Sequence, residues 1–115
     1  TMLALSLSEG ITLLKKANVD PKIFLEVLNS TYFKTGMSEN KAFKMIEGNY
    51  NPTFTLANLK KDITTMTNTA KKLGIELPMI NKAEELYKNA INEGLGDLDY
   101  TGIIEYIKKI NNSKN

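Results

Sequence analysis

Apolar residues recur at intervals of three and four along most of the 115-residue chain, as they do in helices that bury one face. The clearest example runs from Leu56 to Leu73, where the steps between apolar positions alternate between three and four. No stretch alternates apolar and polar residues as a half-buried strand does. The pattern therefore predicts an all-α domain, a single bundle of about six helices.

Several expected helix ends have residues that favour capping. Asp20 followed by Pro21 fits an N-cap and the first helical position. Ser38 is expected to cap a third helix over Lys41–Glu47, and Thr55 the fourth helix. The expected inward positions are Ile23, Phe24, Val27 and Leu28 in the second helix, Leu56, Leu59, Ile63, Met66, Ala70 and Leu73 in the fourth, and Ile103, Ile104, Ile107 and Ile110 in the sixth.

The chain has fifteen positively charged residues, all of them lysine, and neither histidine nor cysteine. Their absence all but excludes a zinc site, a thiol nucleophile and a Ser–His–Asp triad, so no metal site is expected. A net charge of +2 is too balanced to suggest a nucleic-acid partner. No apolar run approaches the length of a membrane span, and we expect a cytoplasmic protein with no membrane partner.

The stretch NPTFTLANLKKDI (residues 51–63) contains charged residues at the start of the expected fourth helix. Asp62 follows Leu59 by three positions and so borders the apolar stripe. Lys61 falls on the far side of the helix, where a lysine is ordinarily solvated. Phe54 has two interpretations, a hydrophobic staple against Leu59 or part of a binding site.

The stretch GLGDLDY (residues 94–100) has two glycines and two aspartates, but it lacks the ligand spacing of a calcium-binding loop. We interpret its glycines as the end of the fifth helix. Asp99 or Thr101 is then expected to begin the sixth.

Three longer stretches follow one another along the chain. The first is LSLSEGITLLKKANVDP, the second is NPTFTLANLKKDI with a Phe-x-x-x-x-x-x-Lys-Asp pattern, and the third is GIELPMINKAEELYKNAINEGLGDLDYTGIIEYI with Gly-x-Gly-x-x-Asp. In this order they resemble the central helix with the turn after it, the Lys-Asp signature and the closing pattern of the C-terminal helical domain of the β-hydroxyacid dehydrogenase family, which includes 3-hydroxyisobutyrate dehydrogenase and the glyoxylate/succinic semialdehyde reductases. The resemblance covers nearly the whole chain, so we expect residues 1–115 to be one C-terminal domain of a two-domain dehydrogenase.

The resemblance implies an enzyme that moves a hydride between NAD or NADP and a small hydroxy acid or semialdehyde. A Rossmann domain, absent from this chain, would bind the cofactor, and the catalytic lysine is expected upstream of Thr1. By the same resemblance, Lys61 matches a lysine that reaches the cofactor, while Phe54 and Asp62 match residues that shape the active site. The chain alone is then expected to be inactive.

The alternative is a non-catalytic helical module that shares this fold and binds a partner, or a second copy, through apolar surface. A nucleosome-associated relative without efficient catalysis is a further possibility, although no basic patch favours it. The first helix is apolar on more than one side, which fits a central helix covered on both faces. Apolar surface left uncovered also predicts a homodimer or a higher homo-oligomer.

Overall fold

The computed structural model describes residues 1–112, and in that range it contains six α-helices and no strand. The α-helices are α1 (Met2–Lys16), α2 (Pro21–Asn29), α3 (Ala42–Glu47), α4 (Leu56–Leu73), α5 (Pro78–Asn92) and α6 (Ile103–Asn112). A π-helical turn, η1 (Met37–Lys41), leads into α3, and a 3-10 turn, η2 (Tyr100–Gly102), leads into α6. The all-α prediction is confirmed. None of the helices in this range is both long and apolar enough to cross a membrane.

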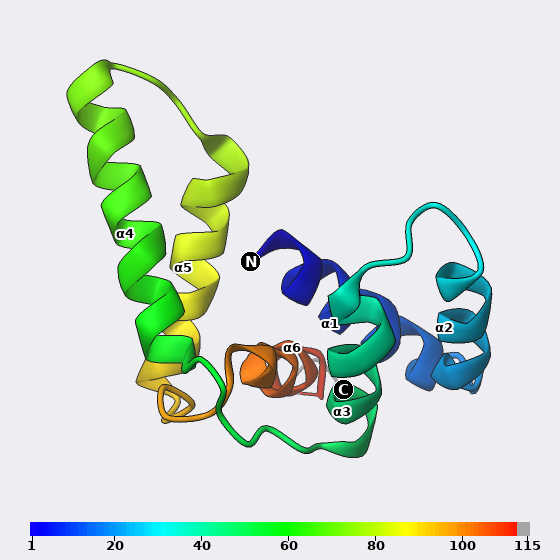
Figure 1. The fold of residues 1–115 in the computed structure, drawn as a ribbon. Coiled ribbons are helices and arrows are strands. Elements are labelled where there is room, and N and C mark those ends of the chain that lie inside the picture. The colour runs from blue at the N-terminus through cyan, green and yellow to red at the C-terminus, as the bar shows by residue number, and fades with distance from the viewer. Residues whose placement is uncertain (113–115) are drawn as a thin grey trace.

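α1 and α6 form the centre of the bundle, between the α4–α5 hairpin on one side and α2 with α3 on the other (Figure 1). Each central helix contributes to two buried apolar clusters. Leu5 and Ile103 belong to the first cluster together with residues of α4 and α5, whereas Leu7 and Ile104 belong to the second with residues of α2 and α3. A helix buried on two sides needs apolar residues around most of its circumference, which explains the composition of α1.

The predicted inner face of α2 is correct at Leu28, which packs against the second cluster, and wrong at Ile23, Phe24 and Val27, which are exposed. Leu25 is fully buried against α1 and α3, whereas Ile23 is 58% and Val27 61% exposed. α2 has only nine residues, and its apolar positions lie on more than one face. Periodicity alone favoured the face with the most apolar residues, and this is not the face that contains Leu25. In α4, the inward prediction also fails at Met66 and Leu73, both of which are exposed.

The third helix begins earlier than predicted. Thr35, rather than Ser38, caps it: the Ser38 N–H donates to Thr35 Oγ1 at 2.9 Å, and the Thr35 N–H donates to Ser38 Oγ at 2.8 Å. This reciprocal pair has the geometry of a capping box, with serine in the place usually taken by glutamate. The helix therefore continues from this turn through η1 into α3, and Lys41 lies inside it.

Candidate functional site

The segment before α4 is held against the loop that follows α5. The Asp99 N–H donates to the Tyr50 carbonyl at 3.0 Å, and the Tyr100 N–H donates to the Phe54 carbonyl at 2.9 Å. The Leu56 N–H, unsatisfied within its own helix, donates to the carbonyl of Leu98 at 2.8 Å. The entry of α4 is therefore fixed from outside the helix.

The Asp99 carboxylate lies at the centre of this contact and is almost fully buried. Oδ1 accepts hydrogen bonds from the Thr53 N–H at 3.0 Å, the Thr53 hydroxyl at 3.1 Å and the Phe54 N–H at 3.3 Å. Oδ2 accepts from the Thr101 hydroxyl at 2.7 Å and from the Thr101 N–H at 3.4 Å, and the second of these bonds caps η2. Of the two residues expected to begin the sixth helix, Asp99 and Thr101, Asp99 is the one that caps, and it caps η2, the turn that leads into α6.

The pKa of Asp99 reflects two opposing effects. Burial disfavours its charged form and raises the pKa, but the hydrogen bonds from Thr53, Thr101, Lys41 and Phe54 outweigh burial and hold it well below the usual range. The carboxylate is therefore ionised at neutral pH.

Lys41 supplies the counter-charge from η1, 58 residues away along the chain. Its Nζ lies 3.1 Å and 3.0 Å from the two carboxylate oxygens of Asp99, and 2.6 Å from Thr53 Oγ1. The ammonium also lies 5.1 Å from the centroid of the Tyr100 ring, within cation–π range. These contacts occupy all three of its N–H donors.

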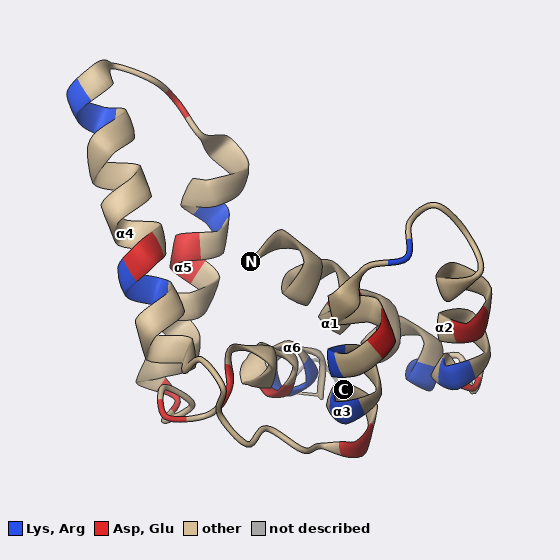
Figure 2. Ribbon diagram, in the orientation of Figure 1, with Lys and Arg blue, Asp and Glu red and all other residues tan. Residues whose placement is uncertain are grey.

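The three residues singled out from the sequence lie at the start of α4 and just before it. The Phe54 backbone is fixed at both its N–H and its carbonyl, yet its side chain is 39% exposed. Lys61 and Asp62 are exposed, and within residues 1–112 neither side chain forms a hydrogen bond or ion pair. They form part of the charged band in the N-terminal half of α4 (Figure 2). Although Asp62 borders the apolar stripe of α4, its side chain remains exposed to solvent.

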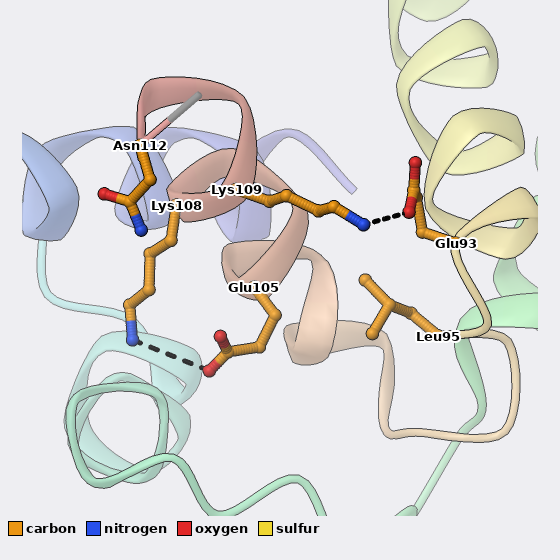
Figure 3. A pocket seen from close by; sticks show the side chains of 6 residues that line it. All are labelled: Glu93, Leu95, Glu105, Lys108, Lys109 and Asn112. Atoms are coloured by element: carbon orange, nitrogen blue, oxygen red, sulfur yellow. Dashed lines mark hydrogen bonds and ion pairs between the residues drawn. The ribbon is translucent and has the colours of Figure 1, made fainter. Parts of the chain in front are cut away.

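The pocket drawn in Figure 3, between the end of α5 and α6, contains none of these three residues. Its lysines already have carboxylate partners, with Lys109 paired to Glu93 and Lys108 lying 3.6 Å from Glu105. Each lysine of this pocket is therefore neutralised by a glutamate that also lines it. No group of three carboxylates in residues 1–112 is placed to hold a metal ion.

The sequence interpretation missed the pairing of Asp99 with Lys41. Asp99 was expected only to begin a helix, and Lys41 only to belong to a short one. The available signal was the Gly-x-Gly-x-x-Asp pattern. Gly94 ends α5 with φ +86°, and the carbonyl of Gly96 accepts from the Ala57 N–H at 3.0 Å, which holds this loop against the first turn of α4.

Comparison with known proteins finds a family model, described as NAD-binding of NADP-dependent 3-hydroxyisobutyrate dehydrogenase, that matches residues 1–107. Glyoxylate/succinic semialdehyde reductase 2 of Arabidopsis thaliana, a chloroplastic protein, is 33% identical over 103 residues, which are 90% of this chain and 29% of that protein. The cytokine-like nuclear factor N-PAC of Aedes aegypti is 31% identical over 97 residues, 84% of this chain and 17% of that protein. The chain thus spans less than a third of either relative.

The fold has a solved counterpart in a 3-hydroxyisobutyrate dehydrogenase from Salmonella typhimurium. The two match with a TM-score of 0.82 at 24% identity, over 90% of this chain and 36% of that one. At this level of identity the likeness shows a common fold.

Proposed function

The chain belongs to the β-hydroxyacid dehydrogenase family, and from this membership we propose that it is the C-terminal helical domain of an NAD- or NADP-dependent dehydrogenase or reductase. The observation that carries the proposal is the family match over residues 1–107. In the full enzyme, the nicotinamide exchanges a hydride with a small hydroxy acid or semialdehyde. The name of the plant relative supports glyoxylate and succinic semialdehyde as the first substrates to test.

Lys61 is proposed to meet the cofactor when the missing Rossmann domain lies against α4. The exposed ammonium, which has no partner in residues 1–112, is compatible with this role, because such a lysine can approach a phosphate as a point charge. Lys60 is a poorer candidate, since it is partly buried and interacts with Glu84 across the α4–α5 hairpin.

Phe54 and Asp62 are proposed to shape the active site from this domain. An exposed ring on a fixed backbone supports the proposal for Phe54, since it can present an apolar surface with little loss of entropy. The lysine that exchanges a proton with the substrate oxygen is proposed to lie upstream of Thr1, outside this chain.

Steady-state kinetics of the full-length enzyme test the assignment of the reaction. NADH or NADPH oxidation is measured with glyoxylate, succinic semialdehyde and tartronate semialdehyde, and in parallel with the 115-residue chain alone. We expect turnover by the full-length enzyme and none by the chain. Turnover by the chain would place the essential acid–base group within these residues and overturn the proposed division of roles.

A substitution at Lys61 tests its contact with the cofactor. Lys61→Met in the full-length enzyme is expected to raise the KM for the cofactor about tenfold, as for the loss of one charged contact worth about 1.4 kcal/mol. Lys72→Met is the matched control, because Lys72 is an exposed lysine in the last turn of the same helix. An unchanged cofactor KM in Lys61→Met removes Lys61 from the cofactor site.

The alternative is a non-catalytic interaction module, and two observations favour keeping it. This domain matches a nuclear factor whose name states no oxidoreductase activity. Apolar residues of α2 and the loop after it are also open to solvent, among them Ile23, Val27 and Phe33. The residues encoded before Thr1 separate the two proposals: a Rossmann domain ending in Gly-x-x-x-Lys-x-x-Asn-Asn supports the dehydrogenase, and an unrelated domain supports the module.

Self-association through this apolar surface is proposed in either case, with a homodimer as the simplest form. Light scattering at tens of micromolar measures the mass directly. A monomer at that concentration contradicts the proposal.

A further inference from the structure

A buried ion pair holds the segment that leads into α4. Lys41 and Asp99 lie in the helix–turn segment before α3 and in the loop after α5, yet both contact Thr53, which belongs to neither. Asp99 also accepts from the Phe54 N–H at 3.3 Å. Three segments far apart in the sequence therefore meet at one carboxylate.

Burying an ion pair at this depth costs desolvation free energy. The Lys41 side chain is 19% exposed and that of Asp99 3%, and apolar residues of similar volume often stabilise a protein as well as a buried pair or better. What the pair provides is a fixed geometry, because each oxygen and each ammonium proton has a defined partner.

The geometry it fixes belongs to the residues assigned to the active site. The Phe54 N–H donates a hydrogen bond to the Asp99 carboxylate, and the Phe54 side chain is partly exposed to solvent rather than packed into the core. Lys61 follows Leu56, whose N–H is bonded to the same loop, by about one and a half helical turns. A rotation or shift at the entry of α4 would thus carry both side chains with it.

We infer that Asp99, with Lys41 as its counter-ion, is a positioning residue that sets the placement of Phe54 and Lys61 for hydride transfer in the full enzyme. The inference rests on the proposed function. Asp99 touches neither cofactor nor substrate, and it acts through the backbone of Thr53 and Phe54.

A double-mutant cycle in the full-length enzyme tests this inference with a readout that a merely structural residue would not change. Asp99→Asn, Lys61→Met and the double variant are compared by the KM for the nicotinamide cofactor and by kcat. Asp99→Asn is expected to raise the cofactor KM by up to about tenfold, because misplacing Lys61 can cost no more than its whole contact with the cofactor, about 1.4 kcal/mol. The double variant is expected to be little worse than Lys61→Met alone. Two independent sites would instead multiply their effects.

The matched control is Asp97→Asn, an exposed aspartate in the same loop, which is expected to leave both parameters unchanged. If Asp99→Asn fails to fold, Thr53→Val takes its place in the same cycle. Thr53 is exposed, so the substitution does not disturb the core. The variant loses the hydroxyl contacts to Lys41 and Asp99 but keeps its backbone N–H. Lys41→Arg, which retains the charge, is expected to recover more of the cofactor affinity than Lys41→Met.

The outcomes separate this inference from the proposed function. Multiplied effects in the double variant would overturn the positioning role and leave Lys61 in the cofactor site. A Lys61→Met variant with unchanged cofactor KM, or a full-length enzyme that does not oxidise NADH or NADPH, would overturn the proposed function and the inference with it. Effects that are less than multiplicative support both.

Discussion

Replacing Lys41 with methionine is the most direct test of the buried pair as a source of stability. Methionine retains the unbranched length of the lysine stem, with sulfur in place of one methylene, and lacks the ammonium. Asp99 would then lose a charge-assisted contact to each oxygen, at 3.1 Å and 3.0 Å. It would keep its hydrogen bonds from Thr53, Phe54 and Thr101.

The expected cost follows from the burial of the two side chains. Removing one partner of a buried ion pair costs about 3–5 kcal/mol, because the other charge remains buried. Asp99 keeps several donors after the substitution, so we expect a loss of about 3 kcal/mol, at the lower end of that range. For a domain of this size, the loss corresponds to a fall in Tm of about 12 °C.

Urea and thermal unfolding of the 115-residue chain, followed by circular dichroism at neutral pH, measure this loss. Lys44→Met is the matched control, since Lys44 lies one turn further along the same helix and is exposed. The control is expected to stay within about 0.5 kcal/mol of the unmodified chain. If Lys41→Met also stays within about 1 kcal/mol, the hydroxyl and N–H donors alone compensate the carboxylate, and the reasoning from ion-pair burial is wrong.

Three further predictions concern stability. Burial opposes ionisation of Asp99, but its hydrogen bonds hold the pKa below the usual value of about 3.9. The stability from the ionised carboxylate is therefore present above about pH 4 and lost as pH falls through the folded-state pKa. Between about pH 4 and 2, the Tm of Asp99→Asn should fall less steeply than that of the unmodified chain, and an equal slope in the two would contradict this. Tyr50→Phe, which loses a 2.6 Å hydrogen bond to Glu105, should cost about 1.5 kcal/mol, whereas Tyr87→Phe removes a buried hydroxyl without a partner in residues 1–112 and should cost nothing or stabilise; urea unfolding showing equal losses would refute the contrast. Gly10→Ala should add about 1 kcal/mol to the free energy of unfolding, because Gly10 is inside α1 and, apart from its chain neighbours and the α1 backbone, no atom lies within 4 Å of a new Cβ. Destabilisation in urea would show a contact that this geometry lacks.

Local sequence signals predicted most of the helices well, because the residues that begin and end a helix act on groups within one or two turns of it. The Asp20 side chain accepts from the Lys22 N–H at 2.9 Å, and Thr55 accepts from the Asn58 N–H at 3.2 Å. Gly74 ends α4 in the left-handed conformation that its position requires. Each of these interactions depends only on near neighbours, so a single sequence contains the information.

The buried faces were less predictable, because they depend on what lies opposite. Leu25 is buried since α1 and α3 pack on its side of α2, and nothing within α2 specifies that side. Tyr87 is fully buried in the first cluster, although a buried tyrosine hydroxyl usually finds a hydrogen-bond partner and this one lacks a partner in the described part of the chain. Periodicity indicates that a face is buried, whereas the choice between two apolar faces is made by tertiary packing.

The candidate site shows the same limit in a sharper form. A lysine that meets another domain and an ordinary surface lysine are both exposed in the helical domain alone, so the exposure of Lys61 does not distinguish them. The distinguishing feature lies behind the surface, where Asp99 and Lys41 fix the entry of α4. An ordinary solvated helix entry needs only its cap, which Thr55 already provides. The additional buried pair is therefore better explained by a requirement for fixed geometry at Phe54 and Lys61 than by the stability of the helix.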